Sequence, residues 1–481
     1  MAGFVEFFGR FWVWCVTLFG GQKYTGENSG GQFPNVTSLL ELLQISDVTS
    51  IGNDFLARNV DFYRNMSLRH GEPNYKLNWH FMSGAAAFVP KLNSNILFER
   101  FFYSLDAGKG HRSIVDKSFV VFTQWSSDWT SPMAPTQLLQ VNETIGSMYF
   151  DDLALPSRTM EGPEDPRVIY NIEKDEINLN FNALTPIEDR QMFGHTIKLY
   201  REGHEIKYNK TEPLVQFEHP KGYRAGTEKN WVPILIKGEL HYIYSLSPLR
   251  ILKCGVESDI SAKDVKKRSK DPEKKKDISS HKKICRVQFK GEAVDSGSQT
   301  GALRSGTNWV EYSPGVYFSF ARTRVMHKKC SYAIYRPHLI VLKFNINSKT
   351  GEYTDPHLIS VSEPITEFDD KLFELYAKKG LSNGDKCDDE AVLTPGSISR
   401  WTGMTQDGNS DIADVIISIN DDMTAMLRIK GFGQAVQKAI ESAPSIKQSR
   451  SISKKGTLVV RAEREMKKFV EKSFAKKSKS N

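Results

Sequence analysis

Short apolar or alternating runs recur along the chain from about Asn78 onward. Examples are AAAFVP, SFVVFTQW, ELHYIYSL, GVYFSFA and LIVLKFNI, which are separated by Gly, Pro, Asn and Asp turns. Runs of this length between turn residues are typical of β-strands. No ten-residue helical patterns alternate with them, which argues against a parallel α/β sheet and favours antiparallel blades, a barrel or a sandwich. The pattern therefore predicts an all-β body.

Two segments depart from this strand-like pattern. A short helical pattern around Ser38 to Leu43 leads into the β body. Near the C-terminus, apolar residues from Val459 to Val470 recur at helical spacing among Lys, Arg and Glu, which predicts an amphipathic helix. Its apolar face either packs on the β body or meets a membrane or a partner.

The net charge of +8 is concentrated in two segments. Residues 261–283 hold ten Lys or Arg against four Asp or Glu, and residues 446–481 hold twelve against three. The rest of the chain is mildly acidic and has no broad phosphate-binding face, so we expect no nucleic-acid partner. The first segment has almost no apolar residues, which predicts a disordered Lys-rich insertion over residues 258–284.

The N-terminal residues 1–20 are aromatic and apolar, but Glu6 and Arg10 interrupt them. The uninterrupted apolar run is shorter than the ~20 residues that span a bilayer. Three interpretations stay open: a short signal anchor, an amphipathic helix at the membrane interface, and a buried helix. The first two would associate the chain with a membrane through its N-terminus.

The five cysteines include no CxxC pair and no Cys/His cluster at zinc spacing. Apart from Cys15 they form an even set, and Cys254 and Cys285 flank the Lys-rich insertion. A disulfide between these two would close that loop. Four N-x-S/T sequons also fit a secretory lumen.

Common catalytic signatures are absent from the sequence. It has no G-x-S-x-G elbow, Walker loop, HExxH motif or GxGxxG after a strand. Adjacent acidic pairs such as Asp151 and Asp152 lack the spacing of a metal-binding DxD motif. We therefore expect neither a metal ion nor a cofactor.

The most constrained string runs from Gly162 to Val168 and reads GPEDPRV. Prolines flank Glu164 and Asp165, bias the preceding residues towards extended conformations and remove two backbone donors. Such a segment would hold a carboxylate rigidly. In an extended segment Arg167 would emerge on the same side as Asp165, so an acid and a cation would share one pocket.

In its setting this string is similar to the EDPR signature of the fungal β-mannosyltransferases and the related β-mannoside phosphorylases. The resemblance continues in order along the chain, over roughly Asn78 to Gly433. Its further blocks are Met82 to Phe102, FVVFTQW, Glu228 to Pro233, His241 to Pro248, Arg304 to Trp309, GVYFSFARTR, Leu393 to Trp401 and Met423 to Gly431.

The resemblance implies an all-β fold, a five-bladed β-propeller with an N-terminal extension and a C-terminal amphipathic helix. Together with the composition of the two ends of the chain, it divides the sequence into an apolar N-terminal segment and possible membrane anchor at residues 1–20, a linker and lead-in at 21–77, the catalytic propeller at 78–440, and a basic helix and tail at 441–481. No internal repeat is visible, so the propeller rests on the resemblance alone.

The resemblance also implies an inverting glycosyltransferase that moves mannose from GDP-mannose to a mannan-type oligosaccharide acceptor, forming β-1,2 linkages. Asp165 would accept the proton of the incoming hydroxyl, directly or through a sugar hydroxyl. The bacterial phosphorylases carry a His-Arg-Pro string where this chain reads Leu246-Ser247-Pro248. That departure favours a nucleotide sugar over free phosphate. The expected location is the lumenal side of the Golgi or of another secretory compartment.

Eight further residues match the family's motifs and would bind substrate or phosphate. Among them, Arg167, Lys229 and Arg304 would neutralise the leaving phosphate. The full set is Glu164, Arg167, Lys229, Asn230, Trp231, Arg304, Thr307 and Arg322.

These assignments have structural alternatives. Asp165 can cap a turn, because Asp-Pro is common there. Lys229 can be an ordinary solvated residue, and Arg304 and Arg322 can form structural pairs. Trp231, like the other tryptophans, is typical of a propeller core.

Two other functions are compatible with these residues. An enzyme of the same fold would phosphorolyse or hydrolyse β-mannosides, and release of mannose 1-phosphate from an oligosaccharide would favour it. A carbohydrate-binding propeller without turnover would keep ligand binding but transfer nothing.

Overall fold

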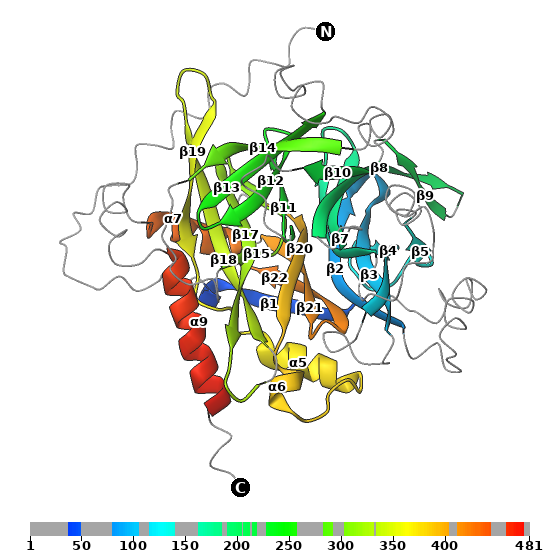
Figure 1. The fold of residues 1–481 in the computed structure, drawn as a ribbon, viewed down its shortest axis with the longest axis vertical. Coiled ribbons are helices and arrows are strands. Elements are labelled where there is room, and N and C mark those ends of the chain that lie inside the picture. Colours follow the sequence, from blue (N-terminus) through cyan, green and yellow to red (C-terminus); the bar gives the residue numbers. More distant parts are fainter. Residues whose placement is uncertain are drawn as a thin grey trace, which may run out of the picture. The chain divides into compact units, whose positions relative to one another are not determined.

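The computed structural model describes a mostly β chain, as the sequence predicts (Figure 1). The residues that the structure describes all belong to one compact unit, Pro34–Asn481. Among them, no helix has both the length and the apolar character needed to cross a bilayer. The described residues are 37–49, 79–104, 115–139, 162–184, 190–203, 205–211, 214–218, 228–256, 282–291, 303–330, 333–403, 411–443 and 458–475.

Some sequence predictions fall on residues outside this set. The apolar segment 1–20 lies outside it, as does the Lys-rich insertion up to residue 281. The last residues of the predicted insertion, from Lys282 onward, instead belong to a strand.

The first sheet is a four-stranded antiparallel meander in sequence order. A 3-10 turn, η3 (Pro90–Leu92), joins its first two strands, and Asn93 ends that turn in the left-handed conformation. The strands are β2 (Trp79–Val89), β3 (Ser94–Ser104), β4 (Val115–Ser126) and β5 (Gln137–Leu138).

The second sheet has nine strands and consists of two antiparallel groups. The parallel pairing of β10 with β14 joins the groups edge to edge. The first group is β6 (Pro163–Asn171), β7 (Glu176–Leu184), β8 (Arg190–Glu202), β9 (Glu205–Lys210) and β10 (Val215–Glu218). The second group is β11 (Val232–Ile236), β12 (Glu239–Leu246), β13 (Leu249–Val256) and β14 (Lys282–Lys290).

Two further sheets complete the body. One contains β15 (Arg304–Ser305), β16 (Val310–Ser313), β17 (Val316–Met326), β18 (Ala333–Ile346) and β19 (Tyr353–Val361). The other has the order β1-β22-β21-β20, with β1 (Glu41–Asp47), β20 (Leu393–Trp401), β21 (Ile412–Ile419) and β22 (Met423–Lys430). The helical elements are η1 (Thr37–Leu39), α5 (Asp369–Lys378), α6 (Lys386–Asp389), α7 (Phe432–Glu441) and α9 (Leu458–Ala475).

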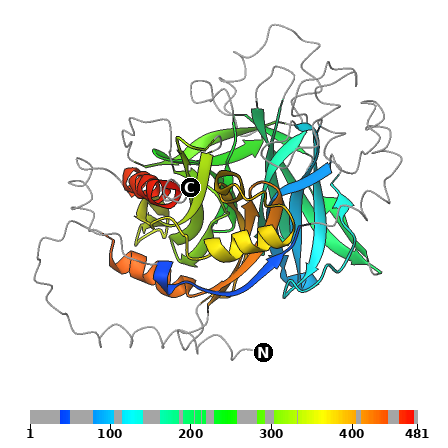
Figure 2. The same ribbon diagram turned by 90° about the horizontal axis from the view of Figure 1, so that it is seen from below.

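The helix predicted around Ser38 to Leu43 is wrong. After one 3-10 turn, the chain from Glu41 to Asp47 forms β1, which pairs antiparallel with β22 (Figures 1 and 2). The open edge of β22 offers backbone donors and acceptors to this segment, and such tertiary pairing overrides a weak local helical preference. The folded body therefore begins well before Asn78.

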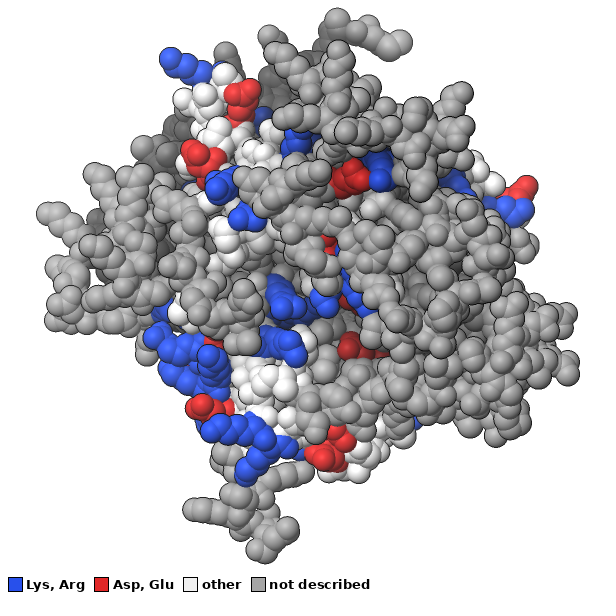
Figure 3. All heavy atoms as spheres, in the orientation of Figure 1, with Lys and Arg blue, Asp and Glu red and all other residues white. Residues whose placement is uncertain are grey.

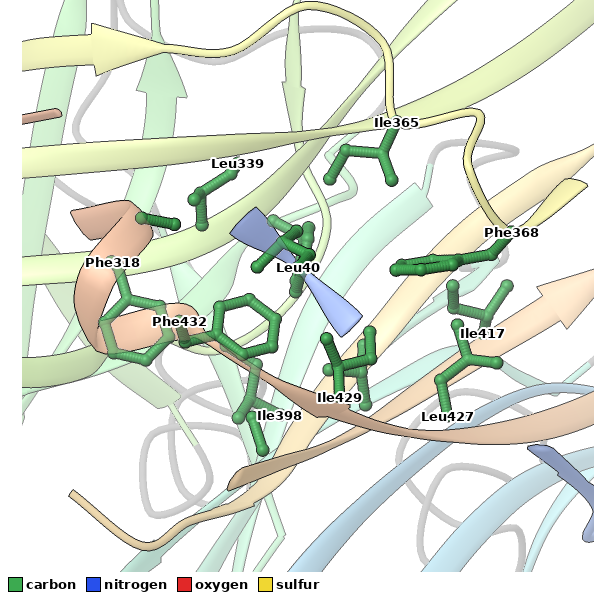
Figure 4. Close-up of a cluster of buried hydrophobic side chains, with 14 of the residues drawn as sticks. Leu40, Phe318, Leu339, Ile365, Phe368, Ile398, Ile417, Leu427, Ile429 and Phe432 are labelled. Carbon is green, nitrogen blue, oxygen red and sulfur yellow. The ribbon is translucent and has the colours of Figure 1, made fainter. Parts of the chain in front are cut away.

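The cores lie between neighbouring strand groups. Figure 4 shows one such core, where Leu40, Phe318 and Phe432 come from far-apart parts of the sequence. Other clusters join the first sheet to β6–β8, β8 and β10 to β12–β14, and β11–β13 to β17–β18. A further cluster joins β22 and β21 to β2 and β3. An apolar cluster thus joins each group to the next.

Helix α9 packs along β17 and β19 at one side of the body (Figure 1). Val459, Ala462, Met466 and Val470 are buried, so the predicted amphipathic helix is present and its apolar face packs on the β body. The expected disulfide between Cys254 and Cys285 is also present, and a second joins Cys330 to Cys387 beside α9.

Candidate active site

The EDPR segment opens β6 with a β-bulge. Glu164 pairs with Asn182 of β7 and Arg167 pairs with Asn180, so two residues, Asp165 and Pro166, oppose a single residue of β7. Asp165 has a φ of 50°, in the left-handed region. The extended conformation predicted for Asp165 is therefore wrong at this residue, because the bulge turns the chain there.

Hydrogen bonds from neighbouring strands fix the backbone of this bulge. The Ser118 hydroxyl donates to the Pro163 carbonyl at 2.6 Å, and the Asn182 amide donates to the Glu164 carbonyl at 3.2 Å. Arg100 Nε in turn donates to Ser118 Oγ at 2.8 Å. The strained segment is thus held from both sides.

The Glu164 carboxylate forms ion pairs with two arginines of the protein. Its Oε1 lies 3.1 Å from Nη2 of Arg100, and its Oε2 pairs with Nη1 of Arg190. The side chain of Glu164 is buried. A carboxylate neutralised in this way positions the segment and does not compete with a phosphate for cations.

The bulge borders a pocket of about 220 Å³ formed where β2, β6, β15 and β20 approach one another. Seven of the nine residues predicted for the site line it: Glu164, Asp165, Arg167, Lys229, Asn230, Arg304 and Arg322. Lys and Arg side chains gather near the middle of the face drawn in Figure 3, beside acidic ones.

The pocket carries more cations than carboxylates. Five cations line it, namely Arg100, Arg167, Lys229, Arg304 and Arg322, against the carboxylates of Glu164, Asp165 and Asp421. Because five cations outnumber three carboxylates, the net charge of the pocket lining is positive. Such a site favours a multiply charged anion.

The cations control the charge of Asp165. Burial alone would raise the pKa of Asp165, but the charges of Arg167, Arg100, Arg322 and Lys229 outweigh it and hold the pKa below its ordinary value. Within the described part of the chain, no hydrogen bond or ion pair occupies this half-buried carboxylate. An ionised carboxylate in this position can accept a proton.

Burial and crowding also lower the pKa values of the cations themselves. Burial and the charge of Arg322 lower the pKa of Arg167 to about 10, although Asp165 opposes them. Burial also lowers the pKa of Lys229 and of Arg304. Arg167 and Arg322 are both buried, and their Nε atoms have no hydrogen-bond partner among the described residues. An anion with several oxygens would satisfy these donors.

Asn230 orients one of these cations. Its Oδ1 accepts a hydrogen bond of 2.6 Å from Nη2 of Arg322, and its φ is 64°. Asn230, which is left-handed like Asp165, thus joins the loop before β11 to β17.

The structure places Trp231 and Thr307 outside the pocket lining. Trp231 is buried, stacks on Phe217 and donates from Nε1 to Glu228 at 3.1 Å. The Thr307 hydroxyl is buried against Ser319 at 2.9 Å. Both side chains therefore belong to the core, which for Trp231 is the structural alternative that the sequence left open.

Several pocket residues were not in the predicted set. Arg100, Tyr335 and Asp421 line the pocket from β3, β18 and the β21–β22 turn. An arginine inside the apolar run of β3 was a usable signal, since an unpaired charge does not belong in such a run. Tyr335 and Asp421 carry no local signal of this kind.

No cluster of three or more His, Cys, Asp or Glu that could hold a metal ion is found in the portion of the chain that the structure describes. A wider groove of about 720 Å³ between β12–β14 and β19 shares no residue with the pocket. We therefore assign the candidate chemistry to the pocket beside Asp165.

The family model for β-mannosyltransferases matches residues 158–469, which contain the EDPR bulge and most of the pocket. The chain belongs to the β-mannosyltransferase family. Within this family it is similar to β-mannosyltransferase 2 of Komagataella phaffii, with 25% identity over 377 residues, covering 74% of this chain and 51% of the relative. It is also similar to β-mannosyltransferase 3 of Candida albicans, with 25% identity over 408 residues, covering 79% of this chain and 65% of the relative.

The chain thus spans about half the length of the first of these relatives. Among solved structures, a levansucrase mutant from B. subtilis aligns with a TM-score of 0.35 and 11% identity, covering 73% of this chain and 82% of that chain. A similarity this low carries no argument about the fold. Family membership rests on the sequence match.

Proposed function

We propose that this member of the β-mannosyltransferase family is an inverting glycosyltransferase that moves mannose from GDP-mannose to a mannan-type oligosaccharide. The observation that carries the proposal is the Asp165 carboxylate, kept ionised by surrounding cations in the pocket of a chain from this family. The β-1,2 linkage and the mannan acceptor come from the resemblance to the fungal enzymes.

The proposed reaction uses the two kinds of charge in the pocket. An acceptor hydroxyl attacks the anomeric carbon of mannose on the face opposite the phosphate, and the bond from that carbon to the phosphate oxygen breaks. The hydroxyl proton passes to Asp165, directly or through a sugar hydroxyl. The nucleoside diphosphate leaves with the bonding electron pair, and Arg167, Lys229, Arg304 and Arg322 stabilise its charge.

A single base is sufficient for this reaction, unlike hydrolysis, which uses two carboxyl groups flanking the bond. Glu164 is already neutralised by Arg100 and Arg190, which supports one active carboxylate from the EDPR segment. The Leu246-Ser247-Pro248 turn supplies neither the His nor the Arg of the phosphorylases, which supports a nucleotide-sugar donor over free phosphate.

We infer a five-bladed propeller as the scaffold. The nine-stranded sheet divides at the parallel β10–β14 pairing, which gives five antiparallel groups in all. Five apolar clusters connect consecutive groups, the last of them back to the first, which supports ring closure. The N-terminal β1 in the last group would close the ring.

A secretory compartment such as the Golgi lumen is part of this proposal. The two disulfides support it, because disulfides persist in oxidising compartments. Association with a membrane through residues 1–20 stays a prediction.

The proposal is tested by incubating the full chain with GDP-mannose and α-mannooligosaccharides and measuring products by mass spectrometry. We expect acceptors that gain mannose residues, and GDP released in equal amount. Mannose 1-phosphate formed from β-mannosides and phosphate, without extension, would instead identify a phosphorylase. Binding of oligosaccharides with no turnover in either assay would identify a carbohydrate-binding protein.

A further inference from the structure

Arginines lie along one face of the sheet at β17, inside the pocket and just beyond it. Arg322 and Arg324 are two residues apart in a stretch that pairs with β18 from Val316 to Met326 without a bulge, so their side chains lie on the same face. Arg304 of β15 pairs directly with Arg322. Three arginines therefore share one face of this sheet.

Tyr335 places Arg324 at the border of the pocket. Residues directly opposite each other in an antiparallel pair project to the same face, with Cβ atoms about 5 Å apart. Tyr335 lies opposite Arg324 and lines the pocket, as do Arg304 and Arg322. Arg324 does not line the pocket, so it stands just outside these three.

Arg324 is exposed and available to an anion. Within the described residues its guanidinium forms no ion pair, and its side-chain contact is a weak one from Nη2 to Met326 Sδ at 3.8 Å. Its charge nevertheless reaches the pocket. Burial and Arg322 lower the pKa of Arg304, and Arg324 lowers it further. Arg324 thus extends the positive potential of the pocket beyond its lining residues.

The pocket is too small to enclose a nucleotide sugar. Its volume of about 220 Å³ is below the ~300–1,000 Å³ of sites that enclose a drug-sized ligand. A hexose and the phosphate attached to it would fill it, and the rest of the donor must leave through the mouth. The outward row of arginines marks a path with the right charge.

We infer that Arg324 binds the second phosphate of a nucleoside diphosphate sugar, the one joined to the nucleoside, just outside the pocket. This inference rests on the proposed function and assigns the residue that distinguishes such a donor from a sugar 1-phosphate. The buried arginines and Lys229 contact the phosphate next to the sugar. Arg324 does not touch the bond that breaks, so it is a specificity residue.

Calorimetric titration of the full chain with GDP-mannose and with mannose 1-phosphate tests the inference. Arg324→Gln should weaken GDP-mannose binding about tenfold, the effect of losing one charge-assisted hydrogen bond at an exposed site. Mannose 1-phosphate binding should stay unchanged, and Arg324→Lys should recover part of the lost affinity. Lys343→Gln, which removes an exposed cation from the adjacent strand β18, should change neither affinity.

The outcomes separate this inference from the proposed function. Equal losses for both ligands in Arg324→Gln would overturn the inference, because Arg324 would then act only through the general field. Unchanged affinity for both ligands would also overturn it. If wild type binds neither ligand, the proposed function itself fails, and the inference falls with it. Thermal melts of the variants confirm that an exposed substitution leaves the fold intact.

Discussion

At the scale of single residues, the site is a carboxylate whose charge its neighbours determine. Four cations lower the pKa of Asp165 despite its burial, and the bulge leaves the side chain at the pocket. The same cations are crowded, so burial and mutual repulsion lower the pKa of Arg167 to about 10. Each group is therefore in the charge state that a base and an anion site require.

The lowered pKa of Asp165 predicts an unusual pH dependence. A base must be ionised, so kcat/KM of the wild type should fall only below the ordinary Asp pKa of about 3.9. Arg322→Gln removes one of the cations, which raises the pKa of Asp165, so the acid limb of the kcat/KM profile should move to higher pH. Its plateau should also drop, because phosphate binding weakens, but the midpoint reports Asp165.

Lys343→Gln is the matched control for this profile and should leave the midpoint in place. An acid limb that stays at the same pH in Arg322→Gln would show that Arg322 does not hold the charge of Asp165.

Local sequence could predict much of the site but not all of it. The EDPR string and its proline flanks marked Asp165 and Arg167, and both line the pocket. Trp231 and Thr307 neighbour pocket residues in sequence, but their side chains enter the core. Tyr335 and Asp421 reach the pocket only through the sheet arrangement, which no short string encodes.

At the scale of elements, the pocket is built from irregularities in three strands. Besides the bulge at Asp165 in β6, register shifts occur at Ser83–Gly84 in β2 and at Gly396 in β20. All three lie at the pocket. The strands approach so closely that a Cβ on Gly396 would lie 1.9 Å from the Gly84 carbonyl oxygen. Bulges of this kind redirect side chains next to active sites.

Gly396→Ala should therefore disturb both stability and activity. The new methyl group meets rigid backbone, so we expect a loss of about 1–3 kcal/mol in the free energy of unfolding, measured by denaturant titration, and reduced turnover. Gly203→Ala is the control, because a Cβ there meets open space. Gly203 has a φ of 62°, so this substitution should lose only the backbone conformational term of the free energy of unfolding and should keep full activity. Full activity in Gly396→Ala would contradict the close approach of β2 and β20.

The apolar and alternating runs predicted most strands. Several of these strands, such as β2 and β17, are buried on both faces, and a short apolar run between turn residues is typical of such a strand. The helix prediction for Ser38 to Leu43 was wrong because the partner strand of this segment, β22, comes from the far end of the chain. The C-terminal helix succeeded because its apolar face has the 3.6-residue period along its whole length.

At the scale of the whole molecule, the N-terminal strand ties the ends of the body together. Thr49 Oγ1 accepts a hydrogen bond from the Thr424 backbone, 375 residues away in sequence. Val48 is fully buried in the cluster between the last and first sheets, and Leu40 lies in the cluster of Figure 4. Neither periodicity nor the family resemblance predicted the pairing of β1 with β22, because the two strands lie at opposite ends of the chain.

Two substitutions in and beside β1 test whether this segment stabilises the body. Val48→Asp places a charge in a fully buried site and should cost about 3 kcal/mol or more in the free energy of unfolding. Leu43→Asp lies in the same segment, but its side chain is 45% exposed, so its effect should be small. Equal and small effects of both substitutions in denaturant titrations would show that β1 and the residues after it do not contribute to the stability of the body.

The most direct test of the account is the transfer activity of Asp165→Asn, measured with GDP-mannose and α-mannooligosaccharides under single-turnover conditions. Asparagine keeps the size of the side chain but cannot accept the proton, so the rate should fall by about 10³-fold with unchanged thermal stability. Asp355→Asn is the matched control, because Asp355 is exposed and also has a positive φ of 44°, and it should keep full activity. Near-normal transfer by Asp165→Asn would contradict the central claim that this carboxylate is the catalytic base.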